Sequence, residues 1–248
     1  MKAVIEHLAS CPSTNSEMAA RLTAPHGAAV TALEQTAGRG QRGTSWESEP
    51  GANALFSVLI RKNVPVAEQF IMSMLVSLAI KGSIDRTLAE HGSERRAKIK
   101  WPNDIYVGEE KICGILIENI LRGALIHRAI IGAGINVNQT KFVSDAPNPT
   151  SIARITGDRI PLTPFVEEVI ESIIERFDTY YAAPDPYKLK SEYMDSLMWT
   201  DGEHPFTDDF SGDFTAHITD VDFDGTLTLS NGAQYAFKEV VFNIPPNH

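Results

Sequence analysis

Four β-like runs lie close together in the middle of the chain, and short polar turns separate the last three of them. The runs cover residues 97–101, 104–107, 111–121 and 124–137. The turns at 108–110 and 122–123 are too short for a parallel crossover, which needs a dozen residues or more. Neighbouring runs are therefore predicted to pair as antiparallel hairpins, and any fold for this chain must accommodate them.

Helical patterns and further strands surround these hairpins. The longest helix is predicted over 67–91, where apolar residues recur at helical spacing. Thr14 followed three residues later by Glu17 fits a capping box and predicts a helix over about 15–24. Shorter helices are predicted over 150–155, 163–181 and 187–197, and strands over 28–34 and 55–60.

The pattern changes near Trp199, after which short strands and tight turns dominate. Asp224-Gly225 and Asn231-Gly232 are strong signals for two-residue hairpin turns, and Ser211-Gly212 marks another turn. A small β-barrel of roughly 50 residues fits this stretch, although that size is near the lower limit for independent folding. The chain is therefore predicted to divide into residues 1–198 and residues 199–248.

Charge and cysteine content exclude some classes of protein. With 22 Lys and Arg against 32 Asp and Glu, the net charge is −10, which disfavours nonspecific nucleic-acid binding. Two cysteines, Cys11 and Cys113, do not make a disulfide framework, and Cys113 in its apolar run is predicted to be a buried thiol. Glu6 comes too early for a secretory signal, and no apolar run reaches about 18 residues. A cytoplasmic protein is expected.

A glycine-rich loop, Gly38 to Gly43, imitates two nucleotide-binding motifs without fitting either. It reads GxGxxG, but the sequence after it is poor helix material and the acidic residue expected about 20 positions later is missing. It also lacks the lysine of a P-loop. What remains is a flexible loop with Arg39 and Arg42, whose guanidinium groups suit carboxylate or phosphate, and with Trp46 nearby. A merely solvated surface loop is the alternative.

Lys100-Trp101-Pro102-Asn103-Asp104 joins two of the predicted strands. Asp104 is a candidate Mg²⁺ ligand beside phosphates, because Mg²⁺ prefers one or two carboxylates together with phosphate oxygens. Taken alone, the segment also fits a β-turn with a buried tryptophan.

Two later strands carry further candidates. By simple alternation Lys111 shares a face with Ile115 and Ile117, where it either reaches solvent or meets a bound anion. Gly114 leaves a spot without a side chain where a ligand can approach. Asn136 ends a strand, and its amide can pair with the donor–acceptor edge of adenine, although a bulge at the strand end is an equal interpretation.

In combination these segments resemble the motifs of biotin–protein ligases, in the same order and from about Cys11 to the end of the chain. The segments that carry the resemblance are Ser13-Thr14-Asn15, Gln35 to Gly43 with Trp46, Lys100 to Asp104, Lys111 to Leu116, and Gly132 to Asn136. The resemblance implies an α+β fold: a mixed, largely antiparallel sheet with helices, followed by a small SH3-like β-barrel. Because the first motif begins at residue 13, the chain resembles the ligase-only form without an N-terminal DNA-binding domain.

The resemblance also implies roles for individual residues. Ser13, Thr14, Asn15, Gln35, Gly38 and Gly114 would form the biotin site. Arg39 and Lys111 would serve both biotin and the adenylate phosphate, and with Asp104 they are the candidate catalytic residues. The nucleotide would be held by Gln41, Arg42, Trp46, Asn103 and Asn136, with Asp104 as a Mg²⁺ ligand.

The implied reaction uses ATP, Mg²⁺ and biotin to form biotinyl-5′-AMP, and then transfers biotin to a lysine of a biotin carboxyl carrier protein or domain. A monomer or weak homodimer is expected, with no DNA or membrane partner. Many relatives have arginine where Gln41 stands, which predicts some leakage of the adenylate. The alternatives are a lipoate–protein ligase and a non-catalytic biotin-binding regulator.

Overall fold

A computed structural model describes residues 3–40, 44–143 and 148–246 of the chain. Gln41 and Arg42 lie outside the described residues. The main sheet has eight strands within the described part, in the order β1-β2-β3-β8-β7-β6-β5, and β4 pairs with β8. The strand bounds are β1 Val4–Cys11, β2 Ala28–Gln35, β3 Ala54–Ile60, β4 Val64–Pro65, β5 Ala97–Lys100, β6 Asp104–Val107, β7 Glu110–Arg122 and β8 Leu125–Ile135.

The predicted hairpins are confirmed. Each strand from β5 to β8 pairs antiparallel with the next strand along the chain. Gly108 and Gly123, in the two short turns, both have φ of 64°, a backbone conformation that glycine adopts without steric cost. Every pair in this sheet is antiparallel except β1 with β2. The mixed, largely antiparallel sheet that the sequence predicts is therefore present.

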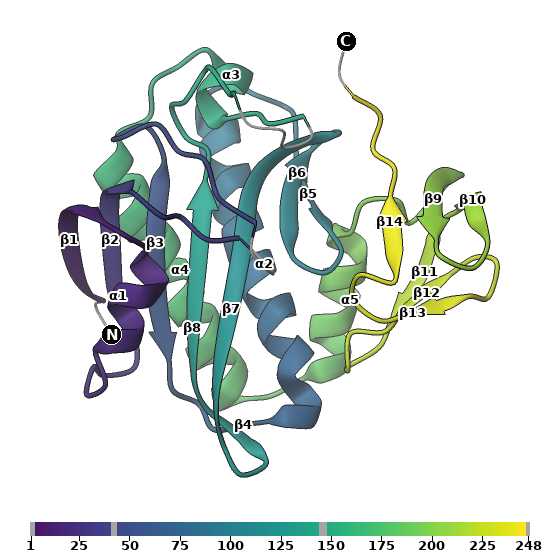
Figure 1. Ribbon diagram of the computed structural model, residues 1–248, viewed down its shortest axis with the longest axis horizontal. Coiled ribbons are helices and arrows are strands. Elements are labelled where there is room, and N and C mark those ends of the chain that lie inside the picture. The colour runs from purple at the N-terminus through teal and green to yellow at the C-terminus, as the bar shows by residue number, and fades with distance from the viewer. Residues whose placement is uncertain (1–2, 41–43, 144–147, 247–248) are drawn as a thin grey trace.

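Helices cover the two faces of the sheet unequally (Figure 1). On one face lies α1, Thr14–Ala20, while α2, Gln69–Glu90, and α4, Leu162–Ala182, pack against the other. The remaining helical elements are η2, Val66–Glu68, α3, Ile152–Thr156, and α5, Pro186–Ser196. The large core lies between the sheet and α2 and α4, and a small cluster around Met18 lies under α1.

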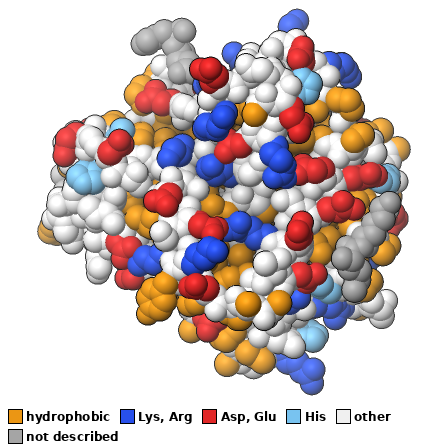
Figure 2. All heavy atoms as spheres, turned by 180° about the vertical axis from the view of Figure 1, so that it is seen from behind, with side chains coloured by type: hydrophobic (Ala, Val, Ile, Leu, Met, Phe, Trp, Pro, Cys, Tyr) orange, Lys and Arg blue, Asp and Glu red, His pale blue; other side chains and the backbone are white. Residues whose placement is uncertain are grey.

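The central helix α2 is apolar around most of its circumference. By length and composition alone the segment Val66–Glu90 is long and apolar enough to cross a membrane, but 61% of its most apolar window is buried inside the protein. Such burial is typical of a core helix, which needs no polar face. Side chains at the outer surface of the helix layer mix both charges, as Figure 2 shows from behind.

Strand β1 was not predicted, because most of its residues are exposed and no alternating pattern marks it. It is an edge strand that pairs parallel with β2, and α1 forms the crossover between the two strands. The predicted capping box is wrong. The N-cap is Ser13 and not Thr14, and its side chain makes no cap bond. Thr14 is the first helical residue, and its hydroxyl donates to Gln35 Oε1.

The segment after Trp199 forms two small antiparallel sheets, which we call the C-terminal unit (Figure 1). Its strands are β9 His204–Asp208, β10 Gly212–Ala216, β11 Ile218–Val221, β12 Leu227–Leu229, β13 Gln234–Tyr235 and β14 Val240–Phe242. Gly225 and Gly232 have φ of 96° and 83° in the predicted turns. Buried residues of this unit, such as Phe206 and Phe242, belong to the same core cluster as the main sheet.

Candidate active site

A cavity of about 1120 Å³ opens on the α1 face of the sheet and extends to the C-terminal unit. Its lining includes most of the predicted site residues that the structure describes: Ser13, Thr14, Asn15, Gln35, Arg39, Trp46, Asn103, Asp104, Lys111, Gly114 and Asn136. The structure therefore brings predicted residues from segments more than a hundred positions apart into one cavity. Gly38 contacts the cavity indirectly, because its carbonyl accepts a hydrogen bond from the Trp46 N–H at 3.1 Å.

At the α1 end of the cavity, buried polar side chains form one hydrogen-bonded group. Gln35 Oε1 accepts from the Thr14 N–H at 2.7 Å and from the Thr14 hydroxyl at 3.2 Å. The Ser57 hydroxyl lies 2.8 Å from Thr14 Oγ1 and 2.5 Å from Asn15 Oδ1. These bonds fix the positions of donors and acceptors before any ligand arrives, as a site that recognises a small polar molecule requires.

Glu118 links this group to the glycine-rich loop, although the sequence did not mark it. Its Oε2 accepts from Asn15 Nδ2 at 2.6 Å and from Arg39 Nη2 at 3.1 Å. Glu118 lies seven residues beyond Lys111 on β7, which is roughly 23 Å along a strand at about 3.3 Å per residue. The Arg39 guanidinium is therefore directed toward the α1 end of the cavity, while Lys111 lies at the other end.

Two glycines on facing strands form a flat part of the cavity wall. Gly114 of β7 pairs with Gly134 of β8. A methyl group on Gly114 would come within 2.8 Å of the Trp46 ring, and one on Gly134 within 2.4 Å of Trp46 Nε1. The indole thus occupies the surface against which the sequence predicted a ligand. Its buried N–H has no hydrogen-bond partner among the described residues.

Lys111 and Asp104 form an ion pair in the cavity, with Nζ 2.6 Å from Oδ2. The predicted face of Lys111 is wrong. A bulge in β7 places Lys111 opposite Tyr106 and Cys113 opposite Ile105, so Ile112 is an extra residue and the alternation shifts. Lys111 Nζ consequently lies 5.9 Å from the centre of the Trp46 ring, on the side of Gly114, whereas Ile115 packs in the core.

Two buried amide oxygens near this ion pair are unsatisfied. Asn103 Oδ1 and Asn136 Oδ1 have no hydrogen-bond partner within the part of the chain that the structure describes. Their residues are 4% and 3% exposed and both line the cavity. A buried polar atom without a partner costs free energy, so each is a candidate contact for a bound ligand.

The site offers few protein ligands for a metal ion. Among the described residues no group of three or more His, Cys, Asp or Glu side chains could hold one. Asp104 beside the unsatisfied Asn103 oxygen fits an ion such as Mg²⁺ that takes most of its ligands from substrate phosphates and water.

Both cysteines are buried, as predicted for Cys113. Burial raises the pKa of the Cys113 thiol well above the ordinary range.

Sequence reasoning missed several residues that line the cavity or bond to its lining. Ser57, Glu118 and Lys238 lie outside any recognisable motif, and only packing brings them to the site. Gly132 had a detectable signal: Gly132 and Gly134 alternate on one strand face, which marks a close approach. A methyl group on Gly132 would come within 2.1 Å of Asn15 Oδ1.

The sequence matches a known family model and several curated proteins. The model of the biotin/lipoate A/B protein ligase family matches residues 8–136. The bifunctional ligase/repressor BirA of Bacillus subtilis is 29% identical over 228 residues, which cover 90% of this chain and 67% of that protein. A biotin–[acetyl-CoA-carboxylase] ligase of Paracoccus denitrificans is 29% identical over 185 residues, which cover 71% of this chain and 75% of that protein.

The fold is also found among solved structures. The biotin protein ligase from Aquifex aeolicus in complex with biotin and ATP has a TM-score of 0.75 at 23% identity, with coverage of 98% of this chain and 99% of that chain. Against BirA of Escherichia coli the match covers 53% of that protein, so the chain corresponds to about half of its length.

Proposed function

We propose that this chain, which belongs to the biotin/lipoate A/B protein ligase family, is a biotin–protein ligase that forms biotinyl-5′-AMP from biotin and ATP and transfers biotin to a protein lysine. The family assignment and two curated relatives, which are named as biotin–[acetyl-CoA-carboxylase] ligases, support this activity. One observation carries the proposal furthest. A single cavity contains the hydrogen-bonded side chains of Thr14 and Gln35 at one end and the Lys111–Asp104 ion pair at the other. It also contains the Asn136 amide oxygen, which has no hydrogen-bond partner among the described residues.

The α1 end of the cavity suits the ring of biotin. Its ureido group has one carbonyl acceptor and two N–H donors, and Thr14, Gln35 and Asn15 offer both donors and acceptors. Gly114 and Gly134 leave room for a flat ligand once the Trp46 ring moves aside. We assign Ser13, Thr14, Asn15, Gln35, Gly38 and Gly114 to biotin.

In the first step a carboxylate oxygen of biotin attacks the α-phosphorus of ATP, and the bond to the pyrophosphate oxygen breaks. Two anions must approach each other, and their repulsion is severe where water is excluded. Lys111 provides a cation that is already in place, and Arg39 provides a second if it exchanges Glu118 for the ligand. Asn136 presents a free amide oxygen for the amino group of adenine.

Mg²⁺ would be held by Asp104 together with the phosphates, and it would neutralise charge on the departing pyrophosphate. Asp104 would then be shared between the ion and Lys111. Trp46 would cover the bound adenylate, and Gln41 and Arg42 would contact its phosphate.

In the second step the acceptor lysine attacks the acyl carbon of the adenylate and AMP leaves. The amine must lose a proton to react, since free lysine has a pKa of about 10.4. Asp104 is the candidate to accept or orient that proton. The loop from residue 36 to residue 49 would exclude water from the mixed anhydride.

The acceptor that we propose is a biotin carboxyl carrier protein or domain, and the site of action is the cytoplasm. The assembly is a monomer or weak homodimer that needs no DNA or membrane. Residues 1–198 form the catalytic unit in this proposal, and residues 199–248 form the accessory unit.

Isotope exchange between pyrophosphate and ATP tests the activity. Exchange should occur with biotin present and should be absent with ATP alone or with lipoate in place of biotin. Exchange that lipoate supports equally well would make the protein a lipoate ligase. A complete lack of exchange, with biotin still bound, would make it a non-catalytic regulator.

A further inference from the structure

The turn between β5 and β6 sets the position of Asp104 but lies outside the hydrogen-bonded ladder of the sheet. Strand β5 ends at Lys100 and β6 begins at Asp104, so residues 101–103 belong to neither strand. Pro102 also has no backbone N–H to donate. Because Asp104 follows this turn directly and pairs with Lys111 at 2.6 Å, the placement of the turn affects the end of the cavity where we propose the reaction.

Tyr193 of α5 supplies a hydrogen bond to this turn. Its Oη–H donates to the Pro102 carbonyl at 2.7 Å. Tyr193 is fully buried and does not line the cavity, whereas Pro102 does. Burial raises the pKa of the Tyr193 phenol well above its ordinary value, so the hydroxyl keeps its proton and remains a donor at neutral pH.

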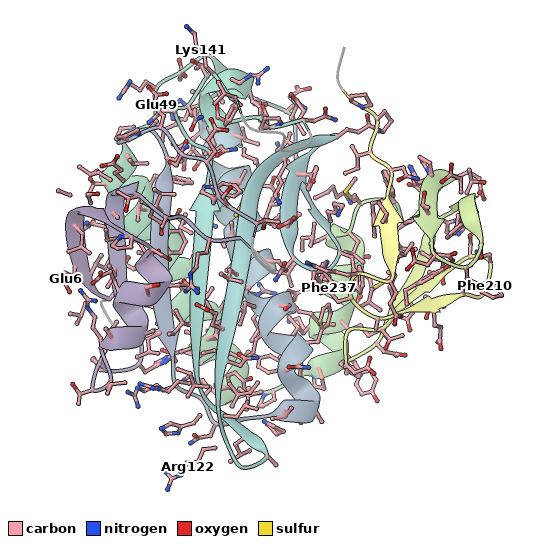
Figure 3. All side chains as sticks on the ribbon, viewed as in Figure 1. Glu6, Glu49, Arg122, Lys141, Phe210 and Phe237 are labelled. Carbon is pink, nitrogen blue, oxygen red and sulfur yellow. The ribbon has the colours of Figure 1, made fainter. Side chains whose placement is uncertain are left out.

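Aromatic packing fixes the ring of Tyr193. Its centre lies 5.7 Å from that of the Phe70 ring of α2, and the two planes meet at 88°. A methyl group on Gly225 would come within 2.7 Å of the same Phe70 ring, while the Gly225 carbonyl accepts from the Trp101 Nε1–H at 3.1 Å. Phe237, whose ring centre lies 5.8 Å from that of Trp101, marks this place beside the β5–β6 hairpin in Figure 3. The turn is therefore held by α5 and by the C-terminal unit together.

The chain that follows α5 is attached to the strand that leads into the turn. Leu197 forms a parallel bridge with Ile99 of β5, and the Met198 N–H donates to the Ile99 carbonyl at 2.9 Å. Tyr193 lies four residues before Leu197. These contacts fix the helix end and the strand relative to each other, so the phenol hydroxyl has a defined place beside the turn.

We propose that Tyr193 is a positioning residue for adenylate formation, because its hydrogen bond to Pro102 keeps Asn103 and Asp104 in place in the cavity wall. This inference rests on the proposed ligase function. Through Asp104 the same bond contributes to the placement of the Lys111 ammonium group. Groups that stabilise a transition state are effective only if the residues around them fix their positions.

Tyr193→Phe tests this role, because it removes the hydroxyl and keeps the ring against Phe70. Single-turnover formation of biotinyl-5′-AMP should slow by roughly 10- to 100-fold, since a shift of about 1 Å at a reacting group can cost about 100-fold. The KM for ATP should rise while the KM for biotin stays native, because Thr14 and Gln35 lie at the other end of the cavity. A mere loss of folded protein would change neither KM.

A double-mutant cycle with Asp104→Ala separates positioning from a general structural role. Asp104→Ala removes a group that Tyr193 is proposed to position, so adding Tyr193→Phe to it should slow the reaction much less than Tyr193→Phe does alone. Losses that simply multiply would overturn the proposal. Should Tyr193→Phe fail to fold, Phe70→Leu takes its place in the cycle, because it loosens the ring and keeps the hydroxyl.

Thr87→Val is the matched control, because it also removes a buried hydroxyl, one that donates to the Ser83 carbonyl at 3.1 Å within α2 and outside the cavity lining. Its adenylate formation should stay native. Native rates and a native KM for ATP in folded Tyr193→Phe would overturn the inference alone. A wild-type protein that makes no biotinyl-5′-AMP would overturn the ligase function and this inference with it.

Discussion

At the scale of single residues, the ion pair formed by Lys111 and Asp104 is the centre of the chemistry that we propose. Both side chains are about three-quarters buried, with exposed fractions of 21% and 25%. An ammonium group held in this way needs no rearrangement when negative charge develops on the α-phosphate, which is the main electrostatic contribution to such reactions. Asp104 keeps Lys111 in position but also competes with the substrate for its charge.

Replacing Lys111 by alanine should therefore remove about 3 kcal/mol or more of transition-state stabilisation, a loss of more than about 100-fold in kcat/KM for adenylate formation. Single-turnover formation of biotinyl-5′-AMP measures this loss. Lys98→Ala, on β5 and outside the cavity lining, provides the control. A Lys111→Ala variant with near-native adenylate formation would remove Lys111 from the catalytic role.

Replacing Gln41 by arginine should reduce the escape of biotinyl-5′-AMP, because arginine adds a cation in a loop assigned to the adenylate phosphate. The measurement compares biotin on bystander lysines for the native protein and for Gln41→Arg, with equal amounts of acceptor. Equal bystander labelling by the two proteins would exclude this role for position 41.

A position in the cavity was predictable where a motif fixes both residue type and spacing, as for Thr14, Gln35 and Asn136. The contacts of Ser57 and Glu118 with these residues were not predictable, because serine and glutamate in a strand carry no signal of their own. Their importance comes from the packing of α1 against β3 and β8, which no local pattern encodes.

At the scale of elements, irregularities in regular structure determine the orientation of side chains at the site. The bulge at Ile112 turns Lys111 to the cavity face, which strict alternation assigns to the wrong side. Strand β1 was missed because an exposed edge strand lacks the apolar alternation on which strand prediction depends. Hairpins and long helices were predicted well because turn residues and periodicity are local properties.

A contact between α4 and the chain beyond β3 makes a pH-dependent contribution to stability. Asp178 accepts from Lys62 Nζ at 2.5 Å and from His26 Nε2 at 3.0 Å. Burial alone would raise the pKa of Asp178, but these hydrogen bonds hold it below its ordinary value. The unfolded chain therefore binds the proton more readily, so the contribution exists above about pH 4 and is lost as pH falls through the folded pKa.

Asp178→Asn should accordingly lower the free energy of unfolding by less than about 1 kcal/mol at about pH 7, since the carboxylate is 38% exposed. The difference between the two proteins should shrink as the pH falls through the folded pKa of Asp178. Urea titrations at about pH 7 and at a series of acidic pH values measure it. A difference that persists unchanged in acid would mean that the effect does not arise from the ionised carboxylate.

At the scale of the whole molecule, the two predicted units share one hydrophobic core. Trp101 in the main sheet packs against Phe242 of the C-terminal unit, and both belong to the same buried cluster. The sequence indicated a change of pattern near Trp199 but could not indicate this continuity, because the contacts join residues more than a hundred positions apart.

The chain should therefore unfold in one cooperative transition despite its two-part organisation. Calorimetry, tryptophan fluorescence and far-UV circular dichroism should give coincident transitions, the usual test of two-state behaviour. Two separate transitions, with the smaller one assigned to residues 199–248, would show that the units are energetically independent.

The central claim is that biotin and ATP react with each other inside this cavity without a covalent enzyme intermediate. Incubation with biotin, ATP and Mg²⁺, removal of free ligands and mass spectrometry of the protein under native and denaturing conditions test it directly. The account predicts one equivalent of biotinyl-5′-AMP that stays bound in the native protein and is released on denaturation. An absence of adenylate, or biotin attached covalently to the enzyme as the species on the reaction path, would contradict it.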